Sequence, residues 1–209
     1  SVLLVSLMEA ADRVDSTTGV QMAYLKQWAK RSRKDMVLRV PDVLPRATHG
    51  RGSVTQLDAL EAAKRLSADV AYLDPPYNQH KYIGNYHIWE TLVRWDNPER
   101  YGKANKRVDV KDAHTKSDFN SKRRAISAME KLVASIRARF IVVSFSNEGF
   151  IPRHEMIRIL STRGEVFDQS HEYKRYVGAQ IGIHNLKGEK VGKVSHLTNK
   201  EFIYICKVV

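Results

Sequence analysis

The stretch Asp74-Pro75-Pro76-Tyr77 has the residue types that most clearly predict chemistry, and it directly follows the apolar run of residues 69–73. Two consecutive prolines stiffen the backbone and remove two N–H donors that would otherwise compete for the neighbouring carbonyl groups. The Asp74 carboxylate and the Pro75 carbonyl therefore form a rigid pair of hydrogen-bond acceptors. A plain structural turn is the competing interpretation, because Pro-Pro is common in loops.

An exocyclic amine on an aromatic ring is the natural complement of this pair of acceptors. It presents two N–H donors, and its nitrogen lone pair is delocalised into the ring, which makes it a weak nucleophile. Acceptors that hold both hydrogens localise the lone pair and stabilise the positive charge that develops on nitrogen during alkylation. Tyr77 adds an aromatic face on which a planar base can stack, an interaction of about 1–3 kcal/mol per base. The motif thus predicts a clamp for an amino-bearing heterocycle.

Hydrophobic periodicity places this motif in an α/β domain that extends over residues 1–209. The continuous apolar runs 69–74 and 139–147 predict strands that helices cover on both faces. Helical spacing within 121–139 predicts a helix between them, so the two strands form a parallel crossover. The same criteria predict helices at 2–18, 19–35, 54–67 and 155–164, a short strand at 36–40, and late strands at 165–174 and 201–209 that could form a hairpin.

The composition favours a polyanionic partner. The chain has 35 Lys and Arg against 23 Asp and Glu, a net charge of +12, and 43% hydrophobic residues, which is typical of a globular protein that binds nucleic acid. Its single cysteine, Cys206, excludes an internal disulfide framework and a Cys-rich zinc site. No apolar stretch reaches the ~18 residues that a membrane span needs, and no signal peptide is visible. We therefore expect a cytoplasmic protein of bacterial type without a membrane partner.

These residues resemble the N6-adenine-specific DNA methyltransferases of the Dam-like or D12 class. DPPY after a strand is the catalytic motif of that family. The longer run DPPYNQHKYIGNYHIWETLVRWDNPERYG is similar to the version found in a subgroup of bacterial adenine methylases. IVVSFSNEGF and SHLTNKEFIYIC are similar to the strands that follow in the family. The resemblance covers about residues 54–209.

The resemblance implies a Rossmann-like class I S-adenosylmethionine-dependent methyltransferase sheet and transfer of a methyl group to adenine N6. Asp74 and the Pro75 carbonyl would bind the amino group, Pro76 would complete the corner, and Tyr77 would stack on a base flipped out of double-stranded DNA. The donor would be S-adenosyl-L-methionine, with Asp58 and Asp74 in its site. For Asp58 the alternative is a favourable interaction with the helix dipole, because it is an acidic residue early in a predicted helix. A restriction-modification setting is implied.

One departure from the family concerns the methyl donor. The family's glycine-rich loop of the FxGxG kind, which follows its first strand, is absent; HGRGS and YVGAQIGIH are the nearest stretches, and neither follows an apolar strand. We therefore expect an incomplete sheet that lacks the N-terminal donor-binding strand. The chain would be the C-terminal part of a longer methyltransferase, or one subunit, with an N-terminal partner segment carrying the donor-binding loop.

Two basic loop regions, 94–124 and 173–200, are candidates for DNA contact. The first has ten Lys and Arg against five Asp and Glu, and the second has six against one. Solvated surface is the alternative for each residue. Asn147 could approach the flipped base, although turn formation explains it nearly as well. The histidines show no metal-ligand spacing. The candidate phosphate contacts are Lys103, Lys106, Arg107, Lys122, Arg123, Arg124, Lys174 and Arg175.

Two rival functions remain open. A methyltransferase that acts on RNA guanine or on protein glutamine also uses a polar residue before Pro-Pro-Tyr, although Asp at the first position favours DNA adenine. The rival from another class is a non-catalytic nucleic-acid-binding fragment or subunit, which the missing glycine-rich loop favours.

Overall fold

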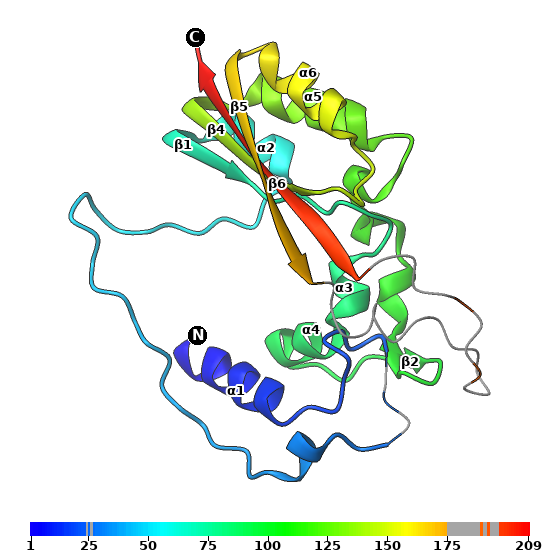
Figure 1. Cartoon of the computed structure of the whole chain (residues 1–209). Coiled ribbons are helices and arrows are strands. Elements are labelled where there is room, and N and C mark those ends of the chain that lie inside the picture. Colours follow the sequence, from blue (N-terminus) through cyan, green and yellow to red (C-terminus); the bar gives the residue numbers. More distant parts are fainter. Residues whose placement is uncertain (24, 26, 175–188, 190–191, 193–196) are drawn as a thin grey trace. The chain divides into compact units, whose positions relative to one another are not determined.

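The computed structural model describes residues 1–23, 25, 27–174, 189, 192 and 197–209 (Figure 1). These residues group into two compact units. Unit 1 comprises Ser1–Ser53 and Lys81–Thr115, and unit 2 comprises Val54–His80 and Lys116–Val209. The Asp-Pro-Pro-Tyr motif belongs to unit 2. The sequence pattern suggested one continuous domain and showed no boundary near residue 53 or residue 80.

Unit 2 is an α/β unit around a mixed four-stranded sheet. The strand order is β1-β4-β6-β5; β1 and β4 are parallel, and β6 runs antiparallel to both β4 and β5. The predicted crossover and the predicted hairpin pairing are both confirmed. The elements are α2 (Ala59–Arg65), β1 (Ser67–Leu73), η4 (Asp118–Asn120), α5 (Ala125–Ser135), β4 (Arg137–Ser146), α6 (Arg153–Ser161), β5 (Gly164–Lys174) and β6 (Thr198–Val208).

The core of unit 2 lies between the sheet and its helices. In β4, alternate side chains are buried, and Ile141, Val143 and Phe145 point into the same hydrophobic cluster as Met129 of α5 and Met156 of α6. Helices α2, α5 and α6 lie together beside the sheet in Figure 1. Burial of these apolar side chains is what fixes the strand register, because a slip by one residue would expose the whole set.

The opposite face of the sheet carries an apolar row that remains accessible. The registers align Tyr72 of β1 with Val142 of β4, then with Ile205 of β6, then with Phe167 of β5. Tyr72, Ile205 and Phe167 all expose large parts of their side chains. Cover on both faces, which the continuous apolar runs predicted, is therefore not present within the described part of unit 2.

Unit 1 contains helices and short irregular elements. Its elements are α1 (Val2–Arg13), η1 (Lys30–Arg33), α3 (Tyr82–Asn85), α4 (His87–Arg94), β2 (Arg100–Tyr101), β3 (Lys106–Arg107), η2 (Val108–Lys111) and η3 (Ala113–Thr115). Strands β2 and β3 form an antiparallel pair. Helices α1 and α4 contact each other. Among the described residues, no helix is long and apolar enough to cross a membrane.

Hydrogen bonds around Gln21 join the two ends of unit 1. Its backbone N–H donates to the carbonyl of Asn85 at 2.6 Å, and its side-chain oxygen accepts from the backbone N–H of Ile88 at 2.8 Å. The ring of His87 lies 3.3 Å from the Gln21 carbonyl oxygen. Burial lowers the pKa of His87, which favours the neutral ring.

Two predicted elements of unit 1 are wrong. The expected amphipathic helix over 19–35 is turn and coil apart from the 3₁₀ turn η1, as far as its described residues (19–23, 25 and 27–35) show. The backbone N–H of Ala29 donates to the Ser16 hydroxyl and the Arg31 side chain bonds to Asp15, so local side-chain contacts replace the helical hydrogen bonds. The expected strand at 36–40 is coil and has no strand partner among the described residues.

Candidate active site at the end of β1

The Asp-Pro-Pro-Tyr motif begins at the carboxyl end of β1, the edge of a parallel pair at which ligands gather in α/β sheets. Asp74 is exposed, and within the described ranges its carboxylate makes no hydrogen bond or ion pair. Pro75, the next residue, is buried. The motif thus places a solvent-accessible acceptor on a fixed backbone corner.

A cavity of about 640 Å³ opens at this corner, and Asp74, Pro75 and Pro76 form part of its wall. Asp58 lies in the same wall and accepts a hydrogen bond of 2.9 Å from the backbone N–H of Leu60, so it is also the N-cap of α2. The structure therefore brings together the two carboxylates that the sequence assigned to the donor site. The other lining residues are Leu57, Ala59, Leu60, Tyr72, Leu73, Lys116, Ser117, Asp118, Phe119, Ala128, Lys131 and Leu132.

Tyr77 is held against the core of unit 2. Its carbonyl accepts a hydrogen bond of 2.9 Å from the backbone N–H of Phe150. Its ring packs on that of Phe145 in a T-shaped arrangement, with 6.4 Å between centroids and an interplanar angle of 80°. The contact leaves Tyr77 half-buried against the hydrophobic core.

Gly149 makes the position of the Phe145 ring possible. A Cβ atom at residue 149 would overlap ring atom Cε1 of Phe145 and would lie only 2.8 Å from Cζ. Phe145 is buried in the core, where close packing limits how far its ring can move. The bare glycine between β4 and α6 therefore lets the loop close over the ring that supports Tyr77.

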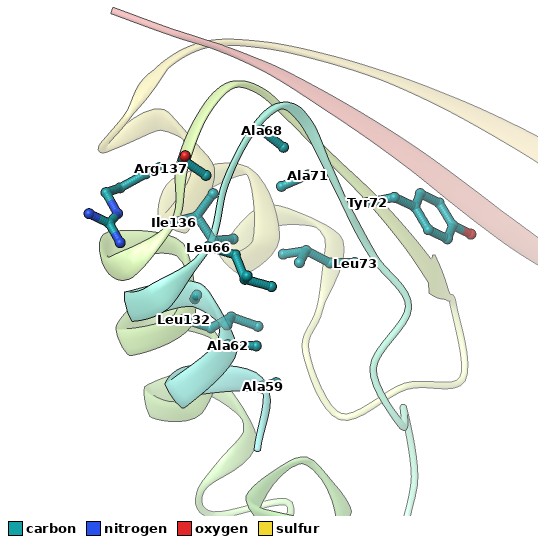
Figure 2. Close-up of a pocket in the computed structure, with 12 residues that line it drawn as sticks. Ala59, Ala62, Leu66, Ala68, Ala71, Tyr72, Leu73, Leu132, Ile136 and Arg137 are labelled. Carbon is teal, nitrogen blue, oxygen red and sulfur yellow. The ribbon is translucent and has the colours of Figure 1, made fainter. Parts of the chain in front are cut away.

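A smaller cavity of about 300 Å³ lies between α2 and β1 (Figure 2). It shares Ala59, Tyr72, Leu73 and Leu132 with the larger one. Its lining contains no carboxylate, and its one charged residue is Arg137. In Figure 2 the Tyr72 ring points away from Ala71 and Leu73, toward the open face of the sheet. This cavity lacks the acceptors that the predicted chemistry needs.

The candidate DNA contacts divide between the two units. In unit 1, Lys103 is exposed and the ammonium of Lys106 lies 5.1 Å above the centre of the Tyr101 ring. In unit 2, three consecutive basic side chains are exposed just before α5, and one of them, Arg124, pairs with Asp118. Lys174 is exposed at the end of β5, whereas Arg175 and most of region 173–200 lie outside the described residues.

Arg107 does not fit a direct phosphate contact. Its side chain is only 2% exposed, and its guanidinium binds Asp96 at 2.6 Å and Asp109 at 2.7 Å. These hydrogen bonds raise the pKa of Arg107 and lower the pKa of both carboxyl groups. The Arg107 guanidinium therefore forms ion pairs that connect β3 to Asp96, which precedes it in the chain, and to Asp109, which follows it.

Asn147 also has a structural use. Its side-chain oxygen accepts a hydrogen bond from the backbone N–H of Lys200, and its own N–H donates to the Lys200 carbonyl, both at 2.9 Å. The neighbouring Glu148 accepts a bond of 2.8 Å from the side chain of Asn199. These contacts fasten the end of β4 to the start of β6, which corresponds to the turn-forming alternative for this residue.

A mixed α/β sheet with an aspartate and two prolines at the end of a parallel strand is consistent with a methyltransferase fold. The chain belongs to the D12 class N6 adenine-specific DNA methyltransferase family, whose family model matches residues 1–155. That match confirms the resemblance inferred from the motif. It also extends upstream of residue 54, beyond the part of the chain in which we found the resemblance.

Curated relatives are modification enzymes. The chain is 33% identical over 195 residues to modification methylase LlaI of Lactococcus lactis subsp. lactis, covering 90% of the chain and 30% of the relative. It is 32% identical over 221 residues to type II methyltransferase M.FokI of Planomicrobium okeanokoites, covering 94% and 33%. The corresponding values for M.NlaIII of Neisseria lactamica are 30% over 200 residues, 96% and 58%. The chain thus spans about a third of the first two relatives. No solved structure matches it.

The sequence missed several residues of this site. Phe119, Lys116 and Lys131 line the cavity from segments far along the chain, and Asn120 bonds to the loop that follows Tyr77. None of them belongs to a motif of recognisable spacing. In the structure, Ser117 and Asn120 form a capping box around η4, and the sequence analysis did not predict it.

Proposed function

We propose that this chain is the catalytic part of a DNA adenine N6-methyltransferase that works in a restriction-modification system. It would transfer a methyl group from S-adenosyl-L-methionine to an adenine flipped out of double-stranded DNA. The observation that carries the proposal is the carboxylate of Asp74, which has no partner among the described residues and lies on a Pro75-Pro76 corner in the wall of a cavity of about 640 Å³. A methylase of cellular DNA would act in the bacterial cytoplasm.

The corner supplies the acceptors that an adenine amine needs. The Asp74 carboxylate and the Pro75 carbonyl accept one N–H each, which keeps the amine in place and directs its lone pair away from the ring. Because these acceptors are fixed before the base arrives, they stabilise the positive charge on N6 in the transition state without reorganisation. Tyr77 supplies the stacking face, and the T-shaped contact with Phe145 keeps its ring from rotating away.

The wall of the cavity suits a cationic methyl donor. S-adenosylmethionine, when bound, supplies an electrophilic methyl group on a positively charged sulfur. The wall has three carboxylates, those of Asp58, Asp74 and Asp118, of which the last is paired with Arg124. Leu57, Leu60 and Phe119 give it apolar surface for a nucleoside. One carboxylate oxygen of Asp58 accepts the hydrogen bond that caps α2, and the other oxygen can accept a hydrogen bond from a ligand. These residues fit part of a donor site.

The remainder of the donor site would come from a segment outside this chain. Strand β1 is the edge of the sheet in the described residues, and the row Tyr72, Val142, Ile205 and Phe167 leaves an apolar face open. An open strand edge beside an apolar face is a surface that another strand and its helix could complete. We assign this place to an N-terminal partner segment or subunit that carries the glycine-rich loop.

A non-catalytic subunit is the second candidate, and the open edge of β1 is the observation that favours it. DNA is incubated with the chain and labelled donor, alone and with the complete product of the encoding gene, and the nucleosides are identified by mass spectrometry. The proposal predicts N6-methyladenine with the complete gene product. DNA binding without any methylated base would favour the non-catalytic subunit, and methylated RNA or protein would favour the other methyltransferase classes.

A further inference from the structure

Asn120 is a buried polar residue outside the motif whose side chain is fully engaged with the motif's loop. It is 5% exposed, at the end of η4. Its amide nitrogen donates to the carbonyl of Asn78 at 2.8 Å and to the carbonyl of His80 at 3.1 Å. Its side-chain oxygen accepts from the backbone N–H of Ser117 at 3.3 Å. This arrangement fixes the amide orientation, since both hydrogens face carbonyl oxygens.

The loop after the prolines needs such a partner. Pro75 and Pro76 have no N–H groups, so the backbone cannot continue the β1 ladder there. A local bond of 2.9 Å from the His80 N–H to the Asn78 side chain turns the chain. The carbonyls of Asn78 and His80 point inward, where an unsatisfied acceptor is costly, and Asn120 satisfies both.

Tyr77 consequently lies between two fixed points of the backbone. Its own carbonyl is held by the Phe150 N–H, and the carbonyl of the next residue, Asn78, is held by Asn120. The ring meets Phe145 on one side. Loss of the Asn120 bonds would free the backbone on the C-terminal side of Tyr77 while leaving the Phe145 contact in place.

Asn120 also joins the two walls of the cavity. Residues 116–119 form the wall that immediately precedes it in the chain, and this segment packs on α5. Asp74, Pro75 and Pro76 form part of the remaining wall. The two hydrogen bonds from Asn120 therefore connect the wall formed by residues 116–119 to the loop that follows the Asp-Pro-Pro-Tyr motif. We infer that Asn120 is a positioning residue that acts through Tyr77, and this inference rests on the proposed function of the cavity.

The sharpest test is Asn120→Asp, which keeps the shape and replaces both N–H donors with an oxygen that faces two carbonyls. Asn120→Ser, which keeps one donor, is the milder variant. In this chain alone, hydrogen exchange of the peptide 73–81 should accelerate about tenfold in Asn120→Asp, as expected for loss of local hydrogen bonds. Exchange in β4 and β6 should stay unchanged. Equal acceleration over the whole sheet, or none in the loop, would overturn the inference.

The catalytic readout uses the complete gene product at saturating DNA and donor. Asn120→Asp should lower kcat on the order of 100-fold, because a misplaced ring loses near-attack geometry, with KM for the donor unchanged. Because Asn120 acts through Tyr77, the double variant with Tyr77→Ala should be little slower than the slower single variant. If the fold-losses in kcat of the two single variants multiplied in the double variant, the inference would be overturned. A wild-type protein that methylates nothing would refute the proposed function, and the exchange result would then decide the inference alone.

Discussion

The ring of Phe145, the last buried apolar residue of β4, packs on the ring of Tyr77 at an interplanar angle of 80°. This contact connects the hydrophobic core of unit 2 with the residue that follows the two prolines. The chemistry proposed for the motif therefore depends on packing in the core. The rigidity of the loop comes from Phe145, Phe150 and Asn120, which are all distant from the motif in sequence.

Gly149→Ala should destabilise unit 2, because the added Cβ would overlap the buried ring of Phe145. Overpacking of this kind costs about 1–3 kcal/mol, and chemical denaturation measures it. Gly52→Ala is the matched control, since nothing lies within 4 Å of the Cβ position there. Its free energy of unfolding should change by less than about 0.5 kcal/mol. Equal effects of the two substitutions would contradict the packing described for Phe145.

The ion pairs of Arg107 should make the stability of unit 1 depend on acid. Arg107 lowers the pKa of Asp96 and Asp109 from the usual 3.8, so the folded state binds protons less readily than the unfolded state. The stability they contribute is complete above about pH 4 and is lost as pH falls through the lowered folded-state values. Unfolding is followed by tryptophan fluorescence, because the three tryptophans, Trp28, Trp89 and Trp95, all belong to unit 1.

Arg107→Met should remove this dependence. The variant should be less stable than wild type at pH 7, because Asp96 loses its guanidinium partner and Asp109 keeps only Arg94 among the described residues. The difference should shrink as pH falls below about 4. A constant difference over the whole pH range would show that Arg107 acts through packing and not through its ion pairs.

The exposed pair Lys122 and Arg123 should contribute to DNA affinity through phosphate contacts. Neither side chain has an ion-pair partner in the described part of the chain. Replacement of both by Ala in the complete gene product should weaken binding and reduce the slope of log K against log salt by about 1.8, or about 0.9 for each contact. Arg158→Ala is the control with the same kind of charge loss, because Arg158 is already paired with Glu130 and Glu155. An unchanged slope in the double variant would remove this pair from the interface.

Local chemistry explains what could be predicted from the sequence. The apolar runs of β1 and β4 and the helical spacing of α5 fixed the parallel crossover, because burial follows these periods directly. The Asp74 corner was equally predictable, since two prolines determine their own backbone. The prediction of a helix at 19–35 was wrong because Ser16 and Asp15, which lie outside the segment, form hydrogen bonds with it. Such bonds override helix propensity.

Contacts that form only in the folded chain explain what could not be predicted. Arg107 has the same residue type as a phosphate contact, and its burial depends on the fold that brings Asp96 and Asp109, 11 and 2 residues away, onto its guanidinium. The same holds for Asn120, whose bonds reach carbonyls 42 and 40 residues away. Asn147 was ambiguous in the sequence, and its bond to Lys200 assigns it to the connection between β4 and β6.

The central claim is that the free carboxylate of Asp74 holds the amine that is methylated, and Asp74→Ala in the complete gene product tests it most directly. Methyl incorporation into adenine should fall at least ~100-fold, the typical loss when one preorganised polar contact to the transition state is removed. The melting temperature should stay unchanged, because Asp74 is exposed and unpaired in the described residues. Asp118→Ala is the control, since Asp118 lines the same cavity but pairs with Arg124. Methylation by Asp74→Ala at the rate of the Asp118→Ala control would contradict the account.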